Sequence, residues 1–303
     1  MKILEVCIHL IVALLLPPLL PGLIAKTKAI VAGRVGPPIL QPWYDVIKLM
    51  RKGSVFSTTT TWVFRAGPVV GLVTALFAAL LVPAGGPAPI AFAGDLILFA
   101  YLFGLGRFFT VAAALDTGSA FEGMGGAREA TFACLAEPAL FFSMLVLAKL
   151  SGSISLTHML GAGLPAMWSA AGAPLVLVSV SLFIVLLAEN CRVPFDDPNT
   201  HLELTMIHEV MVLDHSGPAF GIILYGAAVK LFVFSAIVVQ VIFPVRTGTL
   251  GLDWGIFLAG TFAVAVIVGF VESAMARVSM VRVPNLLVAA CLLSAFGLVL
   301  LAR

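Results

Sequence analysis

The sequence predicts an all-α integral membrane protein, with about eight transmembrane helices in a single domain over residues 1–303. Hydrophobic residues make up 61% of the chain and charged residues 11%, whereas soluble domains contain about 45–50% and about 25%. The apolar residues form continuous runs that can cross a hydrocarbon core of about 30 Å, which takes roughly 20 helical residues. Because the runs lack the alternation of a β-barrel and lipid offers the backbone no hydrogen bonds, only helices account for them.

The predicted spans follow these runs in order along the chain. They lie near residues 1–25, 66–83, 93–116, 131–150, 172–190, 217–243, 254–275 and 284–302. Pro17, Pro18 and Pro21 predict a kink in the first span, because proline removes a backbone donor and clashes with the preceding turn. Residues 151–171 are rich in Gly, Ser and Ala and predict a loop on the face opposite the charged loops.

Lysines and arginines are distributed unevenly between the two ends of these spans. Of the 17 in the chain, eleven lie on the side of the loops after the first, third, fifth and seventh spans, and four lie on the other side. Arg107 and Lys230 fall within spans. Since Lys and Arg near span ends favour the cytoplasm, the sequence predicts a cell inner membrane protein with cytoplasmic charged loops and both termini outside.

Two of the charged loops are predicted to contain amphipathic helices. The first, within residues 41–52, has apolar residues at helical spacing: Trp43, Val46, Ile47 and Met50. The second, within residues 191–216, has a similar stripe: Leu202, Met206, Val210 and Leu213. This spacing indicates helices that lie on the membrane surface or on the bundle, with their polar faces toward headgroups or a soluble partner.

Six ionisable residues fall within the predicted spans or at their inner ends: Arg107, Asp116, Glu137, Glu189, Lys230 and Glu272. A charge at the bilayer centre costs from about 2.5 to well over 10 kcal/mol, so such groups face the bundle interior. Buried carboxylates and lysines are both pushed toward their neutral forms, so small changes nearby can move a proton between them. A static ion pair is the simpler interpretation of any one residue, but six such groups on five helices indicate a proton relay.

Other ligand sites find little support in the sequence. The net charge of +2 is too small to suggest a nucleic-acid partner, and no CxxC pair occurs among Cys7, Cys134, Cys191 and Cys291. His201, His208 and His215 are seven residues apart, which places neighbours about 10 Å apart on a helix, too far to share one metal ion. We expect no metal, no cofactor and no catalytic centre in this chain.

Three ordered motifs resemble subunit one of respiratory Complex I. The first is Gly33-Arg34-Val35-Gly36-Pro37, followed by Gln41, Asp45 and Lys48. The second is Gly125-Gly126-Ala127-Arg128, with Glu137 nine residues later. The third, Glu189-Asn190-Cys191-Arg192-Val193-Pro194-Phe195-Asp196, is similar to that family's Glu-Thr-Asn-Arg-Ala-Pro-Phe-Asp. Their order and spacing cover nearly the whole chain.

After the third motif, the chain departs from the quinone-reducing branch of that family. That branch continues with a Glu-rich run, of which this chain keeps only Glu203. The continuation from Thr200 to Gly217 is more similar to the membrane subunit of group four nickel–iron hydrogenases, the formate hydrogenlyase and hydrogenase-four type complexes. The resemblance implies docking under soluble hydrogenase large and small subunits, which would hold the nickel–iron centre and iron–sulfur clusters, beside antiporter-like membrane subunits.

The resemblance also implies roles for the matching residues. Those expected in a polar network beneath the redox site are Glu137, Glu189, Arg192, Asp196 and Glu203. Those expected to shape a docking loop are Arg34, Gln41, Asp45 and Lys48. The argument from burial adds Arg107, Asp116, Asp214, Lys230 and Glu272 to the coupling set.

The leading hypothesis from the sequence is a subunit that couples electron transfer in a docked soluble arm to proton translocation. The first alternative is a quinone-binding, proton-translocating subunit of an NADH:quinone oxidoreductase-type complex. A stand-alone secondary transporter belongs to another class, and it would favour internal repeats with interrupted helices, which the sequence does not show. A purely structural anchor for the soluble arm is the simplest alternative.

Overall fold

The computed structural model describes residues 2–196, 206–245 and 247–302, and these ranges contain helices but no β-strand. Seven helices are long and apolar enough to span a membrane, and a bent pair near the N-terminus makes eight if it forms one span. The predicted all-α membrane fold is therefore confirmed. The long helices are α4 (Trp62–Leu81), α5 (Asp95–Asp116), α6 (Ala120–Ser151), α8 (Leu164–Glu189), α9 (Gly217–Ile242), α10 (Leu250–Ala274) and α11 (Val283–Leu300).

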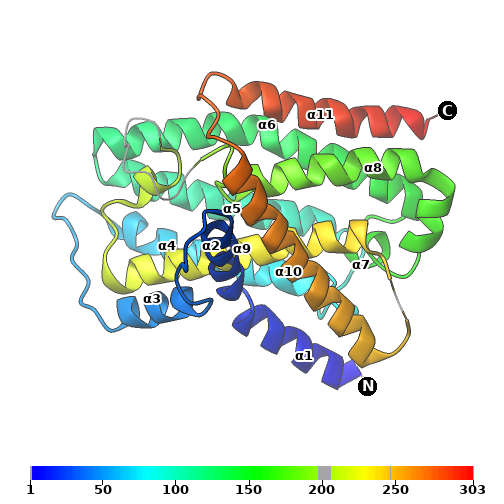
Figure 1. The fold of residues 1–303 in the computed structure, drawn as a ribbon. Helices are drawn as coiled ribbons and strands as arrows, with labels where there is room; N and C mark the ends of the chain where they lie inside the picture. Colours follow the sequence, from blue (N-terminus) through cyan, green and yellow to red (C-terminus); the bar gives the residue numbers. More distant parts are fainter. Residues whose placement is uncertain (1, 197–205, 246, 303) are drawn as a thin grey trace.

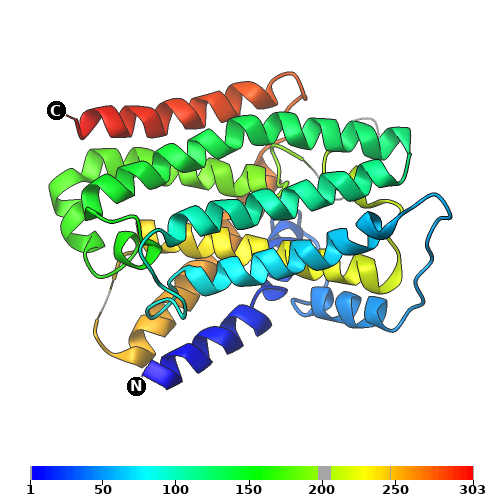
Figure 2. The ribbon, with the colours of Figure 1, turned by 180° about the vertical axis from the view of Figure 1, so that it is seen from behind.

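Most of the long helices run side by side along one common direction, and α10 crosses them obliquely (Figures 1 and 2). Helix α9 is at the centre of the bundle, since nearly all its side chains from Ala228 to Val241 are buried. Both chain termini lie at one end of the bundle, and the short helix α3 (Gln41–Met50) lies at the other (Figure 1). The termini and the first charged loop are therefore at opposite ends, as predicted.

The predicted kink in the first span is confirmed as a complete break. Helices α1 (Lys2–Leu15) and α2 (Leu19–Val31) meet at 50° across Pro17 and Pro18. The break leaves carbonyls of the last turn of α1 without helical partners. Tyr225 of α9 donates to the carbonyl of Leu14 at 2.8 Å, and Trp43 of α3 donates to that of Leu15 at 3.3 Å. Helix α2 continues to Val31, so the expected end near residue 25 is wrong.

Two helices are longer than the hydropathy pattern indicates. Helix α6 starts at Ala120 rather than near 131, and α8 starts at Leu164 rather than near 172, with a kink at Ala171. The predicted loop over 151–171 is therefore mostly wrong, because it also contains the short helix α7 (Leu156–Met159). Leu156, Met159 and Leu164 are fully buried, so tertiary packing outweighs the weak local helix propensity of this segment.

The first predicted amphipathic helix is present as α3, but its orientation differs from the prediction. Val46 is buried, and Leu49 and the end of the partly exposed Met50 side chain lie against Gly221 of α9, whereas Ile47 is exposed. The packed face therefore includes Leu49 in place of Ile47. The reason is the neighbouring helix, since Gly221 has no side chain and lets α3 approach α9 closely.

The second predicted amphipathic helix is absent from the described part of the loop 191–216. This part contains only a 3₁₀ turn, η1 (Glu209–Val212), and Leu213 is exposed rather than part of an apolar face. The Asp196 carboxylate accepts the backbone N–H groups of Ile207 and His208 at 2.9 and 3.1 Å. These bonds fold the chain back into the bundle, where Val210 is fully buried.

Asp95 at the start of α5 is expected to stabilise the end of the bundle opposite α3 through buried hydrogen bonds. Its buried carboxylate accepts the Ser155 hydroxyl at 2.9 Å and the backbone N–H of Leu156 at 2.6 Å. We expect Asp95→Ala to lower the free energy of unfolding by about 1–3 kcal/mol, because buried donors lose their acceptor. Asp95→Asn keeps one acceptor and should lose less. Thermal unfolding in detergent measures both, and equal stability of wild type and Asp95→Ala would contradict the prediction.

Candidate functional site: a buried ion-pair network around a cavity

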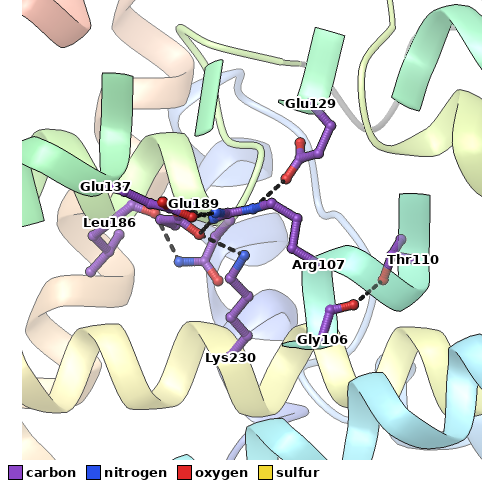
Figure 3. Close-up of polar contacts among 9 residues, drawn as sticks. Gly106, Arg107, Thr110, Glu129, Glu137, Leu186, Glu189 and Lys230 are labelled. Atoms are coloured by element: carbon purple, nitrogen blue, oxygen red, sulfur yellow. Dashed lines mark hydrogen bonds and ion pairs between the residues drawn. The ribbon is translucent and has the colours of Figure 1, made fainter. Parts of the chain in front are cut away.

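The centre of the site is Arg107, in the middle of α5. Its guanidinium contacts Glu137 of α6, and it binds both oxygens of Glu189 of α8 at 2.6 and 2.7 Å (Figure 3). Its Nε lies 3.4 Å from a carboxylate oxygen of Glu129, also in α6. The planar guanidinium offers donors in fixed directions, so one side chain can bridge carboxylates from two neighbouring helices. Arg107 therefore joins α5, α6 and α8 by charge.

Lys230 of the central helix α9 extends this group. Its Nζ lies 2.8 Å from the second oxygen of Glu189, on the side away from Glu129 (Figure 3). Glu189 is the most enclosed member, with 4% of its side chain exposed. Taking such a carboxylate out of water costs several kcal/mol, and only close cations and hydrogen bonds compensate for it. We call Arg107, Glu129, Glu137, Glu189 and Lys230 the Arg107 cluster.

Two further ion-pair groups lie nearer the loops at the α3 end of the bundle. Glu272 of α10 pairs with Lys28 of α2 at 2.8 Å and lies 3.5 Å from Arg192. Asp196 is fully buried and pairs with Arg277 at 3.1 Å, in addition to its backbone bonds in the loop. Each group joins α10, or the residues just after it, to the segment 190–196 that follows α8.

A cavity of about 470 Å³ connects these groups. It is lined by α2, α3, α4, α5, α6, α9, the ends of α8 and α10 and the loop after α8. Its ionisable lining residues include Lys28, Asp45, Arg107, Glu129, Glu189, Arg192, Asp196, Glu209, Lys230 and Glu272. Three glycines lie on its wall: Gly71 of α4, Gly106 of α5 and Gly226 of α9. Gly71 leaves room for the cavity, since a Cβ there would meet nothing within 4 Å, whereas Cβ atoms at Gly106 and Gly226 would meet Thr74 and Leu72 of α4. The site is thus a mostly apolar cavity with ionisable side chains on its wall, closed on one side by the loop 206–215.

Two titratable groups of this loop also line the cavity. Burial lowers the pKa of His215 from 6.5 to about 4, and its ring stacks on Phe64 at a centroid distance of 3.9 Å. Burial raises the pKa of the Glu209 carboxyl, and the neighbouring His208 opposes that shift. His215 is therefore neutral at pH 7, while Glu209 takes up a proton more readily than an exposed carboxyl does.

The depressed pKa of His215 predicts how stability depends on pH. Between pH 6.5 and about 4 the unfolded chain binds a proton at His215 that the folded chain does not, so the free energy of unfolding falls as the pH decreases. The maximal slope is about 1.4 kcal/mol per pH unit. His215→Phe, which keeps the stack on Phe64, should show a smaller decrease over this window in detergent. Identical pH profiles of the two proteins would contradict the assignment.

The structure brings together most of the residues that the sequence singles out. Arg107, Glu137, Glu189 and Lys230 meet in one cluster, Arg192 meets Glu272, and Asp196 lies at the nearby loop. Their close approach agrees with the burial argument, and their role in proton movement stays a prediction.

Two predicted coupling residues lie elsewhere. Asp116 caps the start of α4, because its carboxylate accepts the backbone N–H groups of Thr61 and Phe64 at 2.6 and 3.2 Å. Asp214 is exposed, and it is its backbone N–H that donates to the buried carboxylate of Glu122 at 3.0 Å. Neither has an ion pair with the Arg107 cluster within the described ranges. Glu203 and His201 lie outside the described residues.

The predicted docking residues divide into two kinds. Arg34 and Lys48 are exposed on the loop and on α3. Gln41 donates to Asp45 at 2.9 Å along the first turns of α3, and Asp45 also lines the cavity. This pair stabilises α3 locally, and the docking role of all four residues stays a prediction.

Three members of the network are not among the residues predicted from the sequence. The hydropathy pattern places Glu129 and Lys28 in loops, because α6 begins earlier and α2 ends later than this pattern indicates. Arg277 was counted only as a loop cation, although it pairs with the buried Asp196. A longer helix 120–151 would have placed Glu129 two turns from Glu137, so helix length was the signal that could have identified it. Within the described ranges, no three His, Cys, Asp or Glu residues are placed to hold a metal ion.

The fold and the site together define a multi-pass helical membrane protein that encloses a cavity lined in part by ionisable residues and a network of buried ion pairs. The chain belongs to the NADH dehydrogenase family, whose model matches residues 4–303. The resemblance inferred from the three motifs is thereby confirmed.

Several known proteins are similar to this chain over most of its length. Formate hydrogenlyase subunit 4 of Escherichia coli (strain K12) is 32% identical over 299 residues, which cover 94% of each chain. Hydrogenase-4 component C of the same strain is 33% identical over 237 residues, which cover 77% of this chain and 73% of the relative. An NADH-quinone oxidoreductase subunit of Burkholderia vietnamiensis (strain G4 / LMG 22486) is 26% identical over 215 residues, covering 67% and 60%.

The fold is also shared with a solved structure. A chain of the membrane-bound sulfane sulfur reductase, an archaeal respiratory membrane complex, superposes with a TM-score of 0.84 at 22% identity, covering 98% of both chains. At this identity the match establishes the common fold of the two chains.

Proposed function

We propose that this chain is the membrane subunit of a redox-driven, membrane-bound hydrogenase complex of the formate hydrogenlyase or hydrogenase-4 type. In this role it anchors a soluble electron-transfer arm and couples that arm to proton translocation. Formate hydrogenlyase subunit 4 and hydrogenase-4 component C are each more than 30% identical to this chain, which supports the hydrogenase branch of the family over the quinone-reducing branch. The proposal places the chain in the cell inner membrane, with the charged loops in the cytoplasm, in agreement with the distribution of Lys and Arg.

The observation that carries the coupling proposal is the continuity of the ion pairs along one cavity. Asp196 in the loop, Glu272 near the end of α10 and Glu189 within the bundle all line it. A change in charge or position of the loop 206–215 alters the field at these carboxylates, because a low-dielectric interior screens charges weakly. The proton affinities of Glu189 and of the adjacent cluster then change, and a proton can move along the cavity wall.

The partners in this proposal are soluble hydrogenase large and small subunits, which hold the nickel–iron centre and iron–sulfur clusters, and antiporter-like membrane subunits. Arg34 and Lys48, which are exposed at the α3 end, are proposed to contact the soluble arm. Within this chain, the proposed work of the buried residues is to hold and release protons.

The decisive experiment replaces the most enclosed carboxylate and measures transport. Glu189→Gln in the whole complex, reconstituted in vesicles, should reduce proton translocation per hydrogen molecule turned over by at least several-fold. Glu5→Gln, the same chemical change near the start of α1, serves as the control and should have no effect. If Glu189→Gln assembled at a normal level and translocated as many protons per hydrogen molecule as the wild type, the coupling role would be contradicted and the chain would serve only as an anchor.

Quinone binding is the second candidate function, and the cavity itself favours it. Its volume of about 470 Å³ falls in the range of small-molecule sites, and part of its wall is apolar, including Ile24, Leu72 and Phe103. The similarity to a subunit of an NADH-quinone oxidoreductase agrees with this alternative. Quinone-dependent electron transfer by the purified complex, lost on addition of a quinone-site inhibitor, would favour it over the hydrogenase proposal.

A further inference from the structure

Glu137 lies in a membrane-spanning helix yet is open to the side of the bundle. It is 14 residues from the end of α6 at Ser151, which corresponds to roughly 21 Å along the helix and places it within the hydrocarbon layer. The exposed fraction of its side chain is 45%, against 12% for Arg107 and 4% for Glu189. Hydrocarbon cannot solvate a carboxylate, so a surface of this kind is not a lipid-facing one.

The charges of the Arg107 cluster do not balance. Arg107 and Lys230 supply two cations, whereas Glu129, Glu137 and Glu189 supply three carboxylates. Lys230 and Nη2 of Arg107 both contact Glu189, which leaves Glu137 with one contact, to Nη1 of Arg107. The excess negative charge therefore lies at the open side of the cluster.

The surface around Glu137 is otherwise apolar. On α6 Glu137 is half-buried and lies in line, at helical spacing, with four exposed residues: Ala130, Cys134, Phe141 and Leu145. The adjoining helix α5 exposes Leu105 and Phe108, and both helices lie on the side facing the viewer in Figure 2. The exposed faces of α10 and α11, by contrast, present apolar residues such as Ile267, Leu292 and Phe296 at their centres.

We infer that the α5–α6 face is an interface with a second membrane subunit, whose transmembrane helix covers Glu137 and presents a Lys or Arg side chain to it. A cation is favoured because it balances the excess carboxylate in a water-poor environment. Apolar side chains of that helix would pack on Cys134, Phe141 and Phe108. The inference rests on the proposed function only in that the chain is part of a membrane complex.

A photo-cross-linking experiment on the intact, purified complex tests the location of the interface. Benzoylphenylalanine at Phe141 should form an adduct with an integral membrane subunit, and the same substitution at Phe296, equally apolar and exposed on α11, serves as the comparison. We expect a protein adduct at Phe141 in at least several-fold excess over Phe296. Adducts of Phe141 with lipid alone, or with a soluble subunit, would overturn the inference.

The native cysteines allow the same test without substitution. Cys134 and Cys7 are both exposed, on α6 and α1 respectively. N-ethylmaleimide should modify Cys134 several-fold more slowly in the complex than in the isolated chain, with the Cys7 rate measured in both as the reference for reagent access. Equal rates of Cys134 modification in the complex and in the isolated chain would contradict the inference that a partner covers this face of α6.

The charge at Glu137 is tested separately by assembly. Glu137→Gln keeps an acceptor for Arg107 but removes the charge, so several-fold less of the membrane partner should co-purify, and Glu137→Asp should restore it. The cation assignment would be overturned if Glu137→Gln retained the partner. It would also be overturned if the helix cross-linked to Phe141 had no Lys or Arg at the depth of Glu137. None of these readouts measures proton transport, so they hold or fail independently of the Glu189→Gln experiment.

Discussion

Replacing Arg107 with methionine should lower the free energy of unfolding by about 3–5 kcal/mol, because it breaks a buried ion pair by removing one partner. Three carboxylates, two from α6 and one from α8, would then lie close together with Lys230 as their only close cation in the described network. Methionine matches the aliphatic part of the arginine side chain and lacks the guanidinium, so the loss reports mainly the charged group and its hydrogen bonds. Thermal and denaturant unfolding in detergent, followed by tryptophan fluorescence, gives the difference.

Two further variants separate charge from geometry in this prediction. Arg107→Lys keeps the charge but lacks the planar guanidinium that bridges Glu137 and Glu189, so it should lower the free energy of unfolding by an intermediate amount. Arg34→Met makes the same change at an exposed loop position, and its stability should stay within about 0.5 kcal/mol of wild type. Wild-type stability of Arg107→Met would show that the carboxylates are already neutral in the folded chain.

Filling the cavity from α4 should uncouple the complex without unfolding it. Gly71 lines the cavity, and a Cβ added there would meet no other atom within 4 Å. We expect Gly71→Leu to fold well, since leucine also favours helices over glycine. Its side chain would occupy part of the cavity that Glu189 and Glu272 also line, so proton translocation per turnover should fall several-fold in reconstituted vesicles.

The control for this variant is Gly104→Leu, on α5. A Cβ at Gly104 also meets nothing within 4 Å, but Gly104 is not among the residues that line the cavity. Gly104→Leu should therefore leave coupling unchanged, while both variants unfold at or above the wild-type temperature. Normal proton translocation in Gly71→Leu would exclude the cavity as the route for protons.

The elements that the sequence predicted best are those that depend on local composition. Helices α4, α5, α9, α10 and α11 lie within a few residues of the expected ranges, since length and apolarity alone satisfy the requirement of a bilayer. The expectation was wrong where neighbours decide the backbone. Helix α6 extends to Ala120 and the loop 206–215 folds inward, because Gly125 packs on Val210 and Asp196 binds backbone N–H groups of residues eleven and twelve positions further on.

What the sequence alone determined is that this protein is a helical membrane bundle with ionisable groups in its spans, because lipid excludes both an unpaired backbone and an unburied charge. Only the tertiary structure decided which charges meet. Arg107 contacts Glu129, Glu137 and Glu189, which are 22, 30 and 82 residues away, whereas Asp116 on the same helix caps α4 instead. These pairings depend on how the helices are rotated and packed, and no local pattern of residues contains that information.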